Sequence, residues 1–313
     1  MSYAMQFPGQ GSQSVGMLDE LASQYSLVEE TFAEAKAALG YDLWSLVSNG
    51  PEDDLNQTER TQPALLAAGV ACWRVWLEAG GPQPAFMAGH SLGEYTALVC
   101  AESLDFTDAL RLVRRRGQLM QSAVPAGQGA MAAVIGLSDE DVRKVCAEAA
   151  PTGVLEAVNF NAPGQVVIAG EAALVEKGVS LAAEKGAKMT KVLPVSVPSH
   201  CALMSDAAQT LSEDMQEIEF RAPKVPVIHN LDAKPRENPE EIRKALVAQL
   251  HSPVLWVASI QYLMQSGIAA VIECGPGRVL TGLARRIDRS LSGASVHDSA
   301  SLQQALELAQ GKS

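Results

Sequence analysis

Ser91 is the residue whose surroundings point most clearly to chemistry. It lies at the centre of the sequence GHSLG at 89–93, which matches the G-x-S-x-G pattern of a nucleophile elbow. An apolar run at 84–88 precedes this turn, and a predicted helix follows it to about Leu104. Such a strand-to-helix turn exposes the serine hydroxyl, and the helix N-terminus offers free N–H groups to a developing oxyanion. We therefore predict that Ser91 is a nucleophile; the alternative is a glycine-rich turn in which the serine only caps the helix.

A serine nucleophile needs a general base, and histidine is the side chain best suited to that role at neutral pH. The chain contains five histidines, at positions 90, 200, 229, 251 and 297. His90 adjoins the serine, and the elbow geometry turns it away. His200 follows a predicted strand and two prolines in VSVPSHC, at a junction that would line a cleft between domains. We predict His200 as the base, against the alternatives of a histidine without chemical role and of a dyad with its neighbour Cys201.

A charged residue interrupts the apolar face of the helix predicted over 105–124. The apolar stripe at 3.6-residue spacing consists of Ala109, Leu112, Val113, Met120, Ala123 and Val124. Arg116 lies in the middle of this stripe, so its guanidinium needs a buried anion. The N–H donors of the guanidinium are spaced to bind the two oxygens of a carboxylate, which a substrate could supply. The alternative is a structural ion pair, for example with Glu94.

The rest of the chain alternates between predicted strands and helices, which is typical of α/β layering. Strands are expected at 3–7, 84–88, 225–229 and 270–274. A helix is expected from about Pro63 to Ala79, because proline suits a first helical turn and Gly80-Gly81 suits a stop.

The region from about 131 to 195 has a different order of elements. Strands are predicted at 132–137, 154–160, 165–169 and 188–195, with helices at 138–150 and 171–185, the first capped by Ser138. This βαββαβ order is the ferredoxin-like pattern. We predict an α/β fold in which an α/β-hydrolase-like large domain, residues 1–127 and 197–313, carries a ferredoxin-like subdomain at 128–196.

Six motifs in this order resemble one known family. They are FPGQGSQ near the start, QPALLA at 62–67, GHSLGEY at 89–95, VNFNAPGQVVIAG at 158–170, VPSH at 197–200 and ECGPGRVLTGLARRI at 273–287. Together they resemble the malonyl-CoA:acyl-carrier-protein transacylases of fatty acid synthesis, over nearly the whole chain. The resemblance implies a ping-pong transfer of malonyl from malonyl-CoA, through a serine ester, to the phosphopantetheine thiol of acyl carrier protein.

The resemblance also implies roles for individual residues. Ser91 would be the nucleophile, His200 the general base and acid, and Arg116 the partner of the malonyl carboxylate. Gln249 would accept a hydrogen bond from His200, through either its side chain or its backbone carbonyl. The further implied residues are Gln10 and Leu92, whose backbone N–H groups would form the oxyanion hole, and Asn159 and Asn161 near the cleft.

Composition limits the partners and the compartment. The 313 residues include 47% hydrophobic and 19% charged side chains, and the net charge of −12 argues against nucleic-acid binding. Five scattered cysteines without a CxxC pair favour a reducing compartment, with neither disulfides nor a zinc site. We find no signal peptide and no apolar run of about 18 residues, so we expect a cytoplasmic protein that does not contact membranes. We also expect a monomer. No metal or bound cofactor is expected, and the FPGQGSQ glycines do not fit G-x-G-x-x-G.

An acidic carrier protein would need a local basic patch on this acidic chain. The candidates are Arg114 with Arg115, Lys188 with Lys191, and Arg285, Arg286 and Arg289, each with a simple solvated face as the alternative. Three other functions share part of the pattern: a polyketide-type acyltransferase, a serine esterase or thioesterase, and a catalytically idle carrier-binding protein. The absence of an obvious acid partner for His200 and the presence of Arg116 weigh against a hydrolase.

Overall fold

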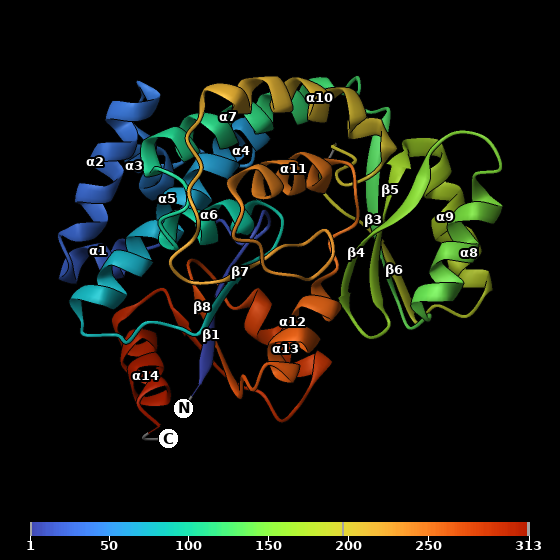
Figure 1. Ribbon diagram of the computed structural model, residues 1–313. Coiled ribbons are helices and arrows are strands. Elements are labelled where there is room, and N and C mark those ends of the chain that lie inside the picture. Colours follow the sequence, from blue (N-terminus) through green and yellow to red (C-terminus); the bar gives the residue numbers. More distant parts are fainter. Residues whose placement is uncertain (1, 196, 312–313) are drawn as a thin grey trace.

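A five-stranded parallel sheet forms the centre of the larger of two lobes in the computed structural model, which describes residues 2–195 and 197–311 (Figure 1). Its strand order is β7 (Val227–Ile228), β2 (Phe86–Gly89), β1 (Tyr3–Phe7), β8 (Ala270–Cys274) and β9 (Ser292–Val296). Every residue of β1 and of β8 is buried, as expected for strands covered on both faces. The strands predicted at 3–7 and 270–274 are confirmed. The strand predicted at 84–88 is shifted to Phe86–Gly89, and the strand predicted at 225–229 is shortened to Val227–Ile228.

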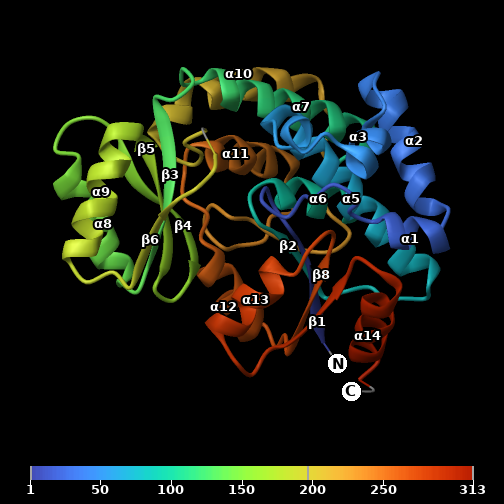
Figure 2. The same ribbon diagram turned by 180° about the vertical axis from the view of Figure 1, so that it is seen from behind.

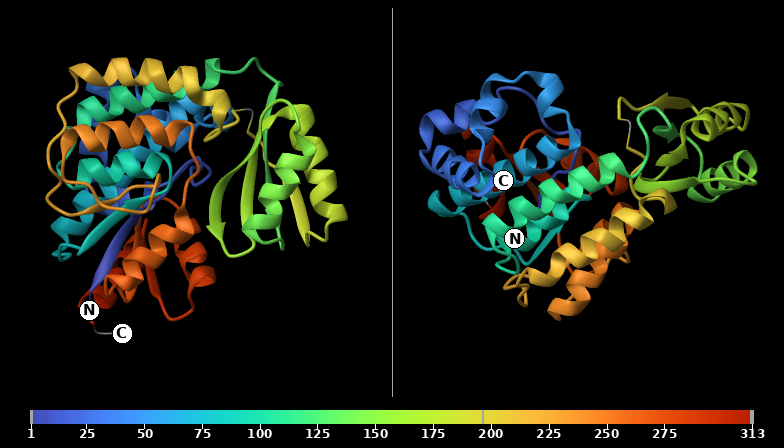
Figure 3. Two further views of the ribbon diagram at one scale, coloured as in Figure 1. Left: turned by 45° about the vertical axis from the view of Figure 1, so that its right-hand side comes forward. Right: turned by 90° about the horizontal axis from the view of Figure 1, so that it is seen from above.

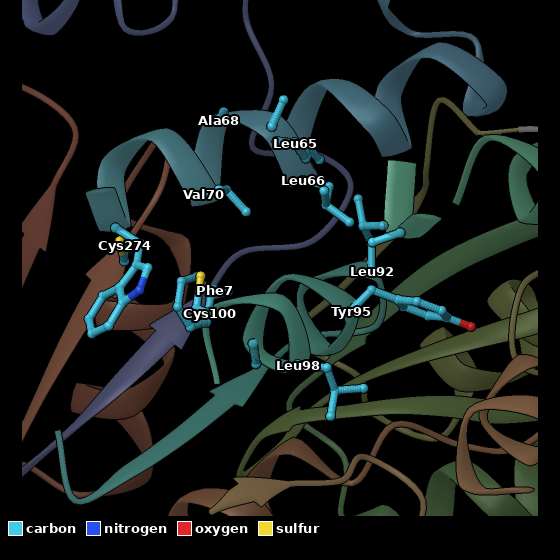
Figure 4. Packing of buried hydrophobic residues seen from close by; sticks show 14 of the residues in the cluster. Phe7, Leu65, Leu66, Ala68, Val70, Leu92, Tyr95, Leu98, Cys100 and Cys274 are labelled. Atoms are coloured by element: carbon cyan, nitrogen blue, oxygen red, sulfur yellow. The ribbon is translucent and has the colours of Figure 1, made fainter. Parts of the chain in front are cut away.

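Helices cover both faces of this sheet. Alternate residues of β1 point to opposite sides. Met5 and Phe7 join a core with α2 (Leu27–Leu39), α5 (Thr58–Glu78), α6 (Leu92–Cys100) and α7 (Phe106–Ser122). Ala4 joins a second core with α12 (Trp256–Gln265) and α13 (Val279–Ile287). Figure 4 shows Phe7 and Cys274 packed among α5 and α6 side chains such as Val70 and Cys100. A Phe7→Ala change in such a core costs about 3–5 kcal/mol of unfolding free energy.

The helices before the smaller lobe are α1 (Asp19–Gln24), α2 (Leu27–Leu39), α3 (Leu43–Asn49), α4 (Glu52–Leu55), α5 (Thr58–Glu78), α6 (Leu92–Cys100) and α7 (Phe106–Ser122). Those after it are α10 (Ser205–Asp214), α11 (Pro239–Leu250), α12 (Trp256–Gln265), α13 (Val279–Ile287) and α14 (Ser299–Ala309), with short 3-10 turns at Ala202–Met204 and Met215–Glu217. The start of β1 and the end of α14 lie at the same end of the large lobe (Figures 1 and 2).

The start of α5 differs from the prediction. The helix begins at Thr58, so Pro63 lies inside it rather than in its first turn, and it ends one residue before Ala79. A proline there removes one helical N–H donor, and the surrounding packing tolerates the loss because α5 is buried along most of its length. The helix after the Ser91 turn is also shorter than predicted, because α6 ends at Cys100.

The smaller lobe is a four-stranded antiparallel sheet with two helices on its outer face (Figures 1 and 3). The sheet order is β4 (Leu155–Ala162), β5 (Gln165–Glu171), β3 (Gly129–Ile135) and β6 (Met189–Val192), with α8 (Asp139–Ala149) after β3 and α9 (Ala172–Glu184) after β5. Ser138 caps α8 by accepting a hydrogen bond from the Asp141 amide, as predicted. The βαββαβ order and this strand order confirm the ferredoxin-like part of the predicted α/β fold.

The predicted division of the chain into 1–127 with 197–313 and 128–196 remains a prediction. The small sheet runs from Gly129 to Val192, and Ser196 at the predicted boundary, like Met1, Lys312 and Ser313, is outside the described residues. Within the described part of the chain, no helix has the length and apolar character needed to cross a membrane.

Candidate active site

The turn between β2 and α6 holds Ser91 in a backbone conformation that few residues other than glycine adopt. Ser91 has φ 51° and ψ −106°, and it lies directly before the first residue of α6. A Cβ atom on Gly89 would lie 1.9 Å from the Gly93 carbonyl carbon, and one on Gly93 would lie 2.0 Å from the Phe7 oxygen. Both glycines are therefore required for the close packing of strand and helix, and the strained serine has the geometry of a nucleophile elbow.

His200 meets the serine from the segment that follows the small sheet. Its Nε2 lies 2.8 Å from the Ser91 Oγ, and its Nδ1 lies 2.7 Å from the backbone oxygen of Gln249. A carbonyl can only accept, so Nδ1 carries the proton and Nε2 presents its lone pair to the serine hydroxyl. The choice left open by the sequence is thus resolved: the Gln249 contact to His200 is through the backbone carbonyl.

The environment of His200 keeps its ring uncharged. The side chain is 2% exposed. The pKa of His200 is lowered to about 3, chiefly by burial and then by the positive charge of Arg116, while the hydrogen bond to the Gln249 carbonyl acts in the opposite direction. A neutral imidazole at neutral pH is the form that can accept a proton from Ser91.

Arg116 points at the same hydroxyl from α7. Its Nη2 lies 3.2 Å from the Ser91 Oγ and 3.1 Å from the Gln249 Oε1, and its Nη1 donates to the Gln62 Oε1 at 2.9 Å. The residue is 1% exposed, its Nε has no partner, and no carboxylate of a described residue lies within ion-pair distance. The alternative of an ion pair with Glu94 is therefore wrong, and a buried cation with only neutral partners is suited to an incoming anion.

Gly117 explains how α7 comes so close to α5. A Cβ atom there would lie 2.7 Å from the Thr58 oxygen and from the Glu59 Cα. The two helices can approach because this position has no side chain. The same approach brings Gln62 of α5 within hydrogen-bond distance of Arg116.

A buried polar cluster around Glu94 supports the turn. Glu94, fully buried in α6, accepts from the Asn230 amide at 2.9 Å and lies 2.7 Å from the His229 Nδ1. The Gln249 side chain donates to Glu94 at 2.9 Å and to the Ser91 oxygen at 3.0 Å. Glu94 therefore holds the side-chain amide of Gln249, the residue whose backbone carbonyl orients His200.

Asn230 ties the cluster to the turn itself. Its Oδ1 accepts from the Ser91 amide at 2.7 Å, and its Nδ2 donates to the Gly89 oxygen at 2.7 Å. Asn230, His229 and Gln62 were not predicted as site residues, and Glu94 was considered only as a partner for Arg116. QPALLA and GHSLGEY contain two of these residues, but nothing near 229–230 signals that β7 lies beside β2.

The two predicted oxyanion donors come from the Ser91 turn itself and from the loop after β1. Leu92 is the first residue of α6, and its amide donates to no described residue. Gln10 follows β1, and the adjacent Gly9 is so close to the turn that a Cβ atom would lie 2.4 Å from the His90 oxygen. The Ser91 amide is occupied by Asn230, so the Gln10 and Leu92 amides are the free donors here, and their role remains a prediction.

Of the two predicted asparagines on β4, one reaches the turn. The Asn161 Oδ1 lies 2.8 Å from the His90 Nε2, which turns His90 away from the serine hydroxyl as predicted. Asn159 has a buried Oδ1 without a partner among the described residues, and its backbone bridges to Val254. The structure thus joins Asn161 to the site through His90 and assigns no contact with Ser91 or His200 to Asn159.

The Cys201 thiol does not belong to this arrangement. It is buried, it donates to the Pro198 oxygen, and burial raises its pKa to about 12, so the alternative dyad with His200 is wrong. All five cysteines are free and buried. Among residues 2–195 and 197–311, no group of three or more histidine, cysteine or acidic side chains could hold a metal ion.

Comparison with known proteins covers nearly the whole chain. Residues 6–305 match the acyl transferase domain. The malonyl CoA-acyl carrier protein transacylase of Escherichia coli K12 is 55% identical over 306 residues, covering 98% of this chain and 99% of that protein. The protein of the same name from Bacillus subtilis is 42% identical, covering 97% of this chain and 96% of its own length.

Solved structures agree with this similarity. An acyl carrier protein S-malonyltransferase from Vibrio cholerae has a TM-score of 0.95 and 57% identity, covering 97% of this chain and 99% of that one. A malonyl-transacylase solved in complex with a holo type II PKS acyl-carrier protein has a TM-score of 0.97 and 55% identity, covering 98% and 100%.

Proposed function

Because the chain belongs to the acyl transferase family of malonyl CoA-acyl carrier protein transacylases, we propose that it moves malonyl from malonyl-CoA to the phosphopantetheine thiol of an acyl carrier protein, for fatty acid biosynthesis. One observation carries the proposal. The Ser91 Oγ lies 2.8 Å from a neutral histidine and 3.2 Å from a buried arginine that has no carboxylate partner. A nucleophile, a base and a carboxylate receptor therefore meet at one atom.

The first half-reaction forms a malonyl-serine ester. Ser91 gives its proton to the His200 Nε2 as its oxygen attacks the thioester carbonyl. The Gln10 and Leu92 amides would stabilise the resulting oxyanion. The carbon–sulfur bond then breaks, and His200 returns the proton to the sulfur of coenzyme A as it leaves.

The second half-reaction reverses these steps with a new thiol. His200 takes the proton of the phosphopantetheine thiol, the sulfur attacks the ester, and Ser91 recovers the proton as its oxygen leaves. Both steps balance without a metal ion or a bound cofactor. Since the first product leaves before the second thiol enters, the kinetics should be ping-pong.

Arg116 would select the substrate. A malonyl group differs from an acetyl group by its free carboxylate, and the N–H groups of the guanidinium can donate to its two oxygens. Pairing also relieves the cost of a buried charge that has only the neutral partners Gln62 and Gln249. Substrates without a carboxylate leave that charge unpaired and should react more slowly.

The partner of His200 favours transfer over hydrolysis. A hydrolase of this type usually offers a carboxylate to its histidine, whereas His200 has the neutral Gln249 carbonyl. A neutral acceptor fixes the ring but stabilises the imidazolium less than a carboxylate does. A thiol needs less help from a base than water does. A histidine whose imidazolium form is less stabilised therefore suits a thiol acceptor better than water.

Intact mass spectrometry of both proteins tests the proposal. The chain is incubated with malonyl-CoA and holo acyl carrier protein, with acetyl-CoA and Ser91→Ala as controls. We expect a malonyl group on the carrier that is absent with Ser91→Ala and weak with acetyl-CoA. Release of coenzyme A without loading of the carrier would instead indicate a thioesterase. Loading of a polyketide carrier but not of a fatty acid carrier would indicate a polyketide-type acyltransferase.

We also propose that the protein acts in the cytoplasm as a monomer. Five free, buried cysteines fit a reducing compartment, and the site is assembled within one chain, because Ser91, His200 and Arg116 meet without a partner subunit. Light scattering during gel filtration measures the mass directly. A stable dimer mass at micromolar concentration would contradict the monomer.

A further inference from the structure

The two peptide groups that flank Ser91 are held by side chains from other segments. The Ser91 N–H donates to the Asn230 Oδ1 at 2.7 Å, and the Ser91 oxygen accepts from the Gln249 Nε2 at 3.0 Å. The oxygen also accepts from the Glu94 amide at 3.1 Å, within the first turn of α6. The N–H, in contrast, has Asn230 as its only acceptor among the described residues.

Asn230 reaches the turn because it follows β7, and β7 pairs in parallel with β2. The chain after β7 therefore continues beside the turn that follows β2. The Asn230 Nδ2 donates to the Gly89 oxygen at 2.7 Å. Since the Gly89 oxygen can only accept and the Ser91 N–H can only donate, these partners fix the orientation of the Asn230 amide. One side chain thus joins the peptide groups on either side of His90, and we call this pair of hydrogen bonds the Asn230 clamp.

The backbone of Asn230 is fixed independently of the clamp. Its N–H donates to the Glu94 Oε2 at 2.9 Å, and its oxygen accepts from the Leu255 amide at 3.0 Å. The residue is fully buried. A side chain that rotated out of the clamp would leave buried donors and acceptors unpaired, which is unfavourable. The clamp is therefore rigid at both of its ends.

The clamp acts on a residue whose backbone is strained. Ser91 has φ 51° and ψ −106°, and such a conformation persists only where the surrounding structure holds it. At the start of a helix the N–H groups have no helical acceptor, so Asn230 supplies the contact that holds the peptide group before Ser91. A rotation of this peptide group would move the Ser91 Oγ away from the His200 Nε2, which lies 2.8 Å from it.

The residues that contact the serine hydroxyl do not hold its N–H. His200 and Arg116 both contact the Ser91 Oγ. The Asn230 side chain contacts the backbone of Gly89 and Ser91, and among the described residues it forms no hydrogen bond with the hydroxyl, with His200 or with Arg116. Asn230 can therefore influence the reaction through the position of Ser91, and not through contact with a substrate.

We propose that Asn230 is a positioning residue, whose clamp on Gly89 and Ser91 holds the nucleophile in the strained conformation that faces His200; the inference rests on the proposed function. The clamp governs how often the hydroxyl is aligned for attack, and it does not contribute to binding of the acyl group. Loss of the clamp should therefore lower the maximal rate of acylation and leave the preference for malonyl-CoA over acetyl-CoA unchanged. Arg116 should have the opposite effect on that preference.

Three full-length variants test the clamp. Asn230→Ala removes both hydrogen bonds. Asn230→Asp keeps the shape and the acceptor, but it can donate to the Gly89 oxygen only when the new carboxyl group is protonated. Asn238→Ala is the matched control, because the Asn238 Oδ1 also accepts from two backbone N–H groups, at the start of α11, without contact to the Ser91 turn.

Two reactions of Ser91 are measured for each variant. Single-turnover acylation by malonyl-CoA gives the maximal rate and the half-saturating concentration from about pH 5.5 to about pH 8.5. Labelling of Ser91 by a sulfonyl fluoride that has no carboxylate reports on the nucleophile without the proposed substrate. Each rate is divided by that of the wild-type chain at the same pH.

The surroundings of position 230 make this pH range informative. The titratable and charged groups near it are Glu94, the adjacent His229 and, through Gln249 and Ser91, Arg116 and His200. The negative charge of Glu94 favours the protonated form of a carboxyl group at position 230. The pKa of His200, lowered to about 3, keeps the base neutral over the whole range.

We expect Asn230→Ala to lower the maximal acylation rate about a hundredfold and to change the half-saturating concentration by less than about threefold. Labelling by the sulfonyl fluoride should fall in parallel. At the low end of the pH range Asn230→Asp should react about tenfold or more faster than Asn230→Ala, and this advantage should shrink as the new carboxyl group ionises. Asn238→Ala should react within about twofold of the wild-type chain.

Equal rates for Asn230→Asp and Asn230→Ala at every pH would overturn the proposal, and so would a wild-type rate for Asn230→Ala. An equal loss in Asn238→Ala would reduce the effect to general stability and also overturn it. If Asn230→Ala does not fold, a loss in Asn230→Asp that does not recover at low pH contradicts the clamp. If the wild-type chain takes no malonyl group but its labelling depends on Asn230 as expected, the proposed function fails and the clamp stands.

Discussion

Two buried histidines lie near the Ser91 turn, and they have opposite kinds of partner. His229 lies 2.7 Å from the Glu94 carboxylate, in a cluster that holds the backbone of the turn. His200 contacts the serine hydroxyl and a neutral carbonyl, with the cation Arg116 nearby. The carboxylate that a hydrolase would offer to its catalytic histidine is thus used here for the scaffold.

Gln249 connects the surroundings of His229 with those of His200. Its backbone oxygen accepts from His200, while its side chain donates to Glu94 and to the Ser91 oxygen. The arrangement fixes the direction of the imidazole without placing a negative charge against it. One aspartate supplies both orientation and charge stabilisation in many triads, whereas here the Gln249 carbonyl supplies the orientation alone.

Removing each histidine gives the largest expected contrast. His200→Ala removes the group that takes the serine proton, and we expect the acylation rate to fall about a thousandfold or more. His229→Gln leaves an amide beside Glu94, and we expect a loss of about tenfold or less. Single-turnover acylation by malonyl-CoA measures both. Equal losses would mean that the Glu94–His229 pair takes part in proton transfer.

Arg116 tests whether the unpaired charge selects the substrate. Arg116→Ala removes the carboxylate receptor, so kcat/KM for malonyl-CoA should fall about a hundredfold. The rate with acetyl-CoA should not fall in parallel, because that substrate has no carboxylate to pair. Competition between the two substrates measures the ratio directly. A parallel loss for both would assign Arg116 to folding or to the serine rather than to selection.

Gln249→Glu brings a second carboxylate next to Glu94. The Gln249 side chain lies 2.9 Å from Glu94 and 3.1 Å from the Arg116 Nη2. Because the new carboxylate loses the donor to Glu94, and Arg116 offsets only part of the repulsion, we expect the unfolding free energy to fall by about 2 kcal/mol or more at pH 7. One of the two carboxyl pKa values would be raised above its unfolded value, so the loss should shrink as the pH falls and that group is protonated. Urea unfolding at several pH values measures this.

Gln249→Ala is the matched control for that variant. It keeps the backbone carbonyl that orients His200 and adds no charge. Its loss of stability should not depend on pH in the range where carboxyl groups titrate. If Gln249→Glu were as stable as the wild-type protein at pH 7, the attraction of Arg116 would outweigh the repulsion from Glu94, and the prediction would be wrong.

The lowered pKa of His200 predicts a smaller effect of pH on stability. Below about pH 6.5 the unfolded chain binds a proton at this residue, but the native ring, with a pKa of about 3, stays neutral. Stability should therefore fall as the pH is lowered, by about 2 kcal/mol between pH 6.5 and 5 from this residue. His200→Gln should reduce that slope, whereas Ser91→Ala should keep it. An unchanged slope in His200→Gln would contradict the lowered pKa.

Local patterns predicted the parts of the site that local sequence determines. GHSLG defines the turn at Ser91, and the apolar stripe of one helix places Arg116 on its buried face, since helical periodicity decides which side a residue takes. The βαββαβ order of the small lobe was also predicted, because Ser138 caps α8 and turn residues separate β4 from β5. Pro63 misled the prediction, because a proline can lie inside a helix whose packing compensates for the lost donor.

Contacts between distant segments could not be predicted from such patterns. Asn230 reaches Ser91 only because β7 lies beside β2 in the sheet, and no periodicity encodes that neighbour. Gln62 reaches Arg116 only because Gly117 lets two helices approach. The choice between the side chain and the backbone of Gln249 depends on a rotation that the sequence does not specify.

Trapping the covalent intermediate shows whether Ser91 carries the malonyl group. The chain is mixed with malonyl-CoA alone, quenched in acid, digested, and the peptide that contains Ser91 is sequenced by mass spectrometry. We expect a malonyl ester on Ser91 that disappears when holo acyl carrier protein is added, with the malonyl group recovered on the carrier. A carrier that becomes loaded while no ester forms on Ser91, or an ester on another residue, would contradict it.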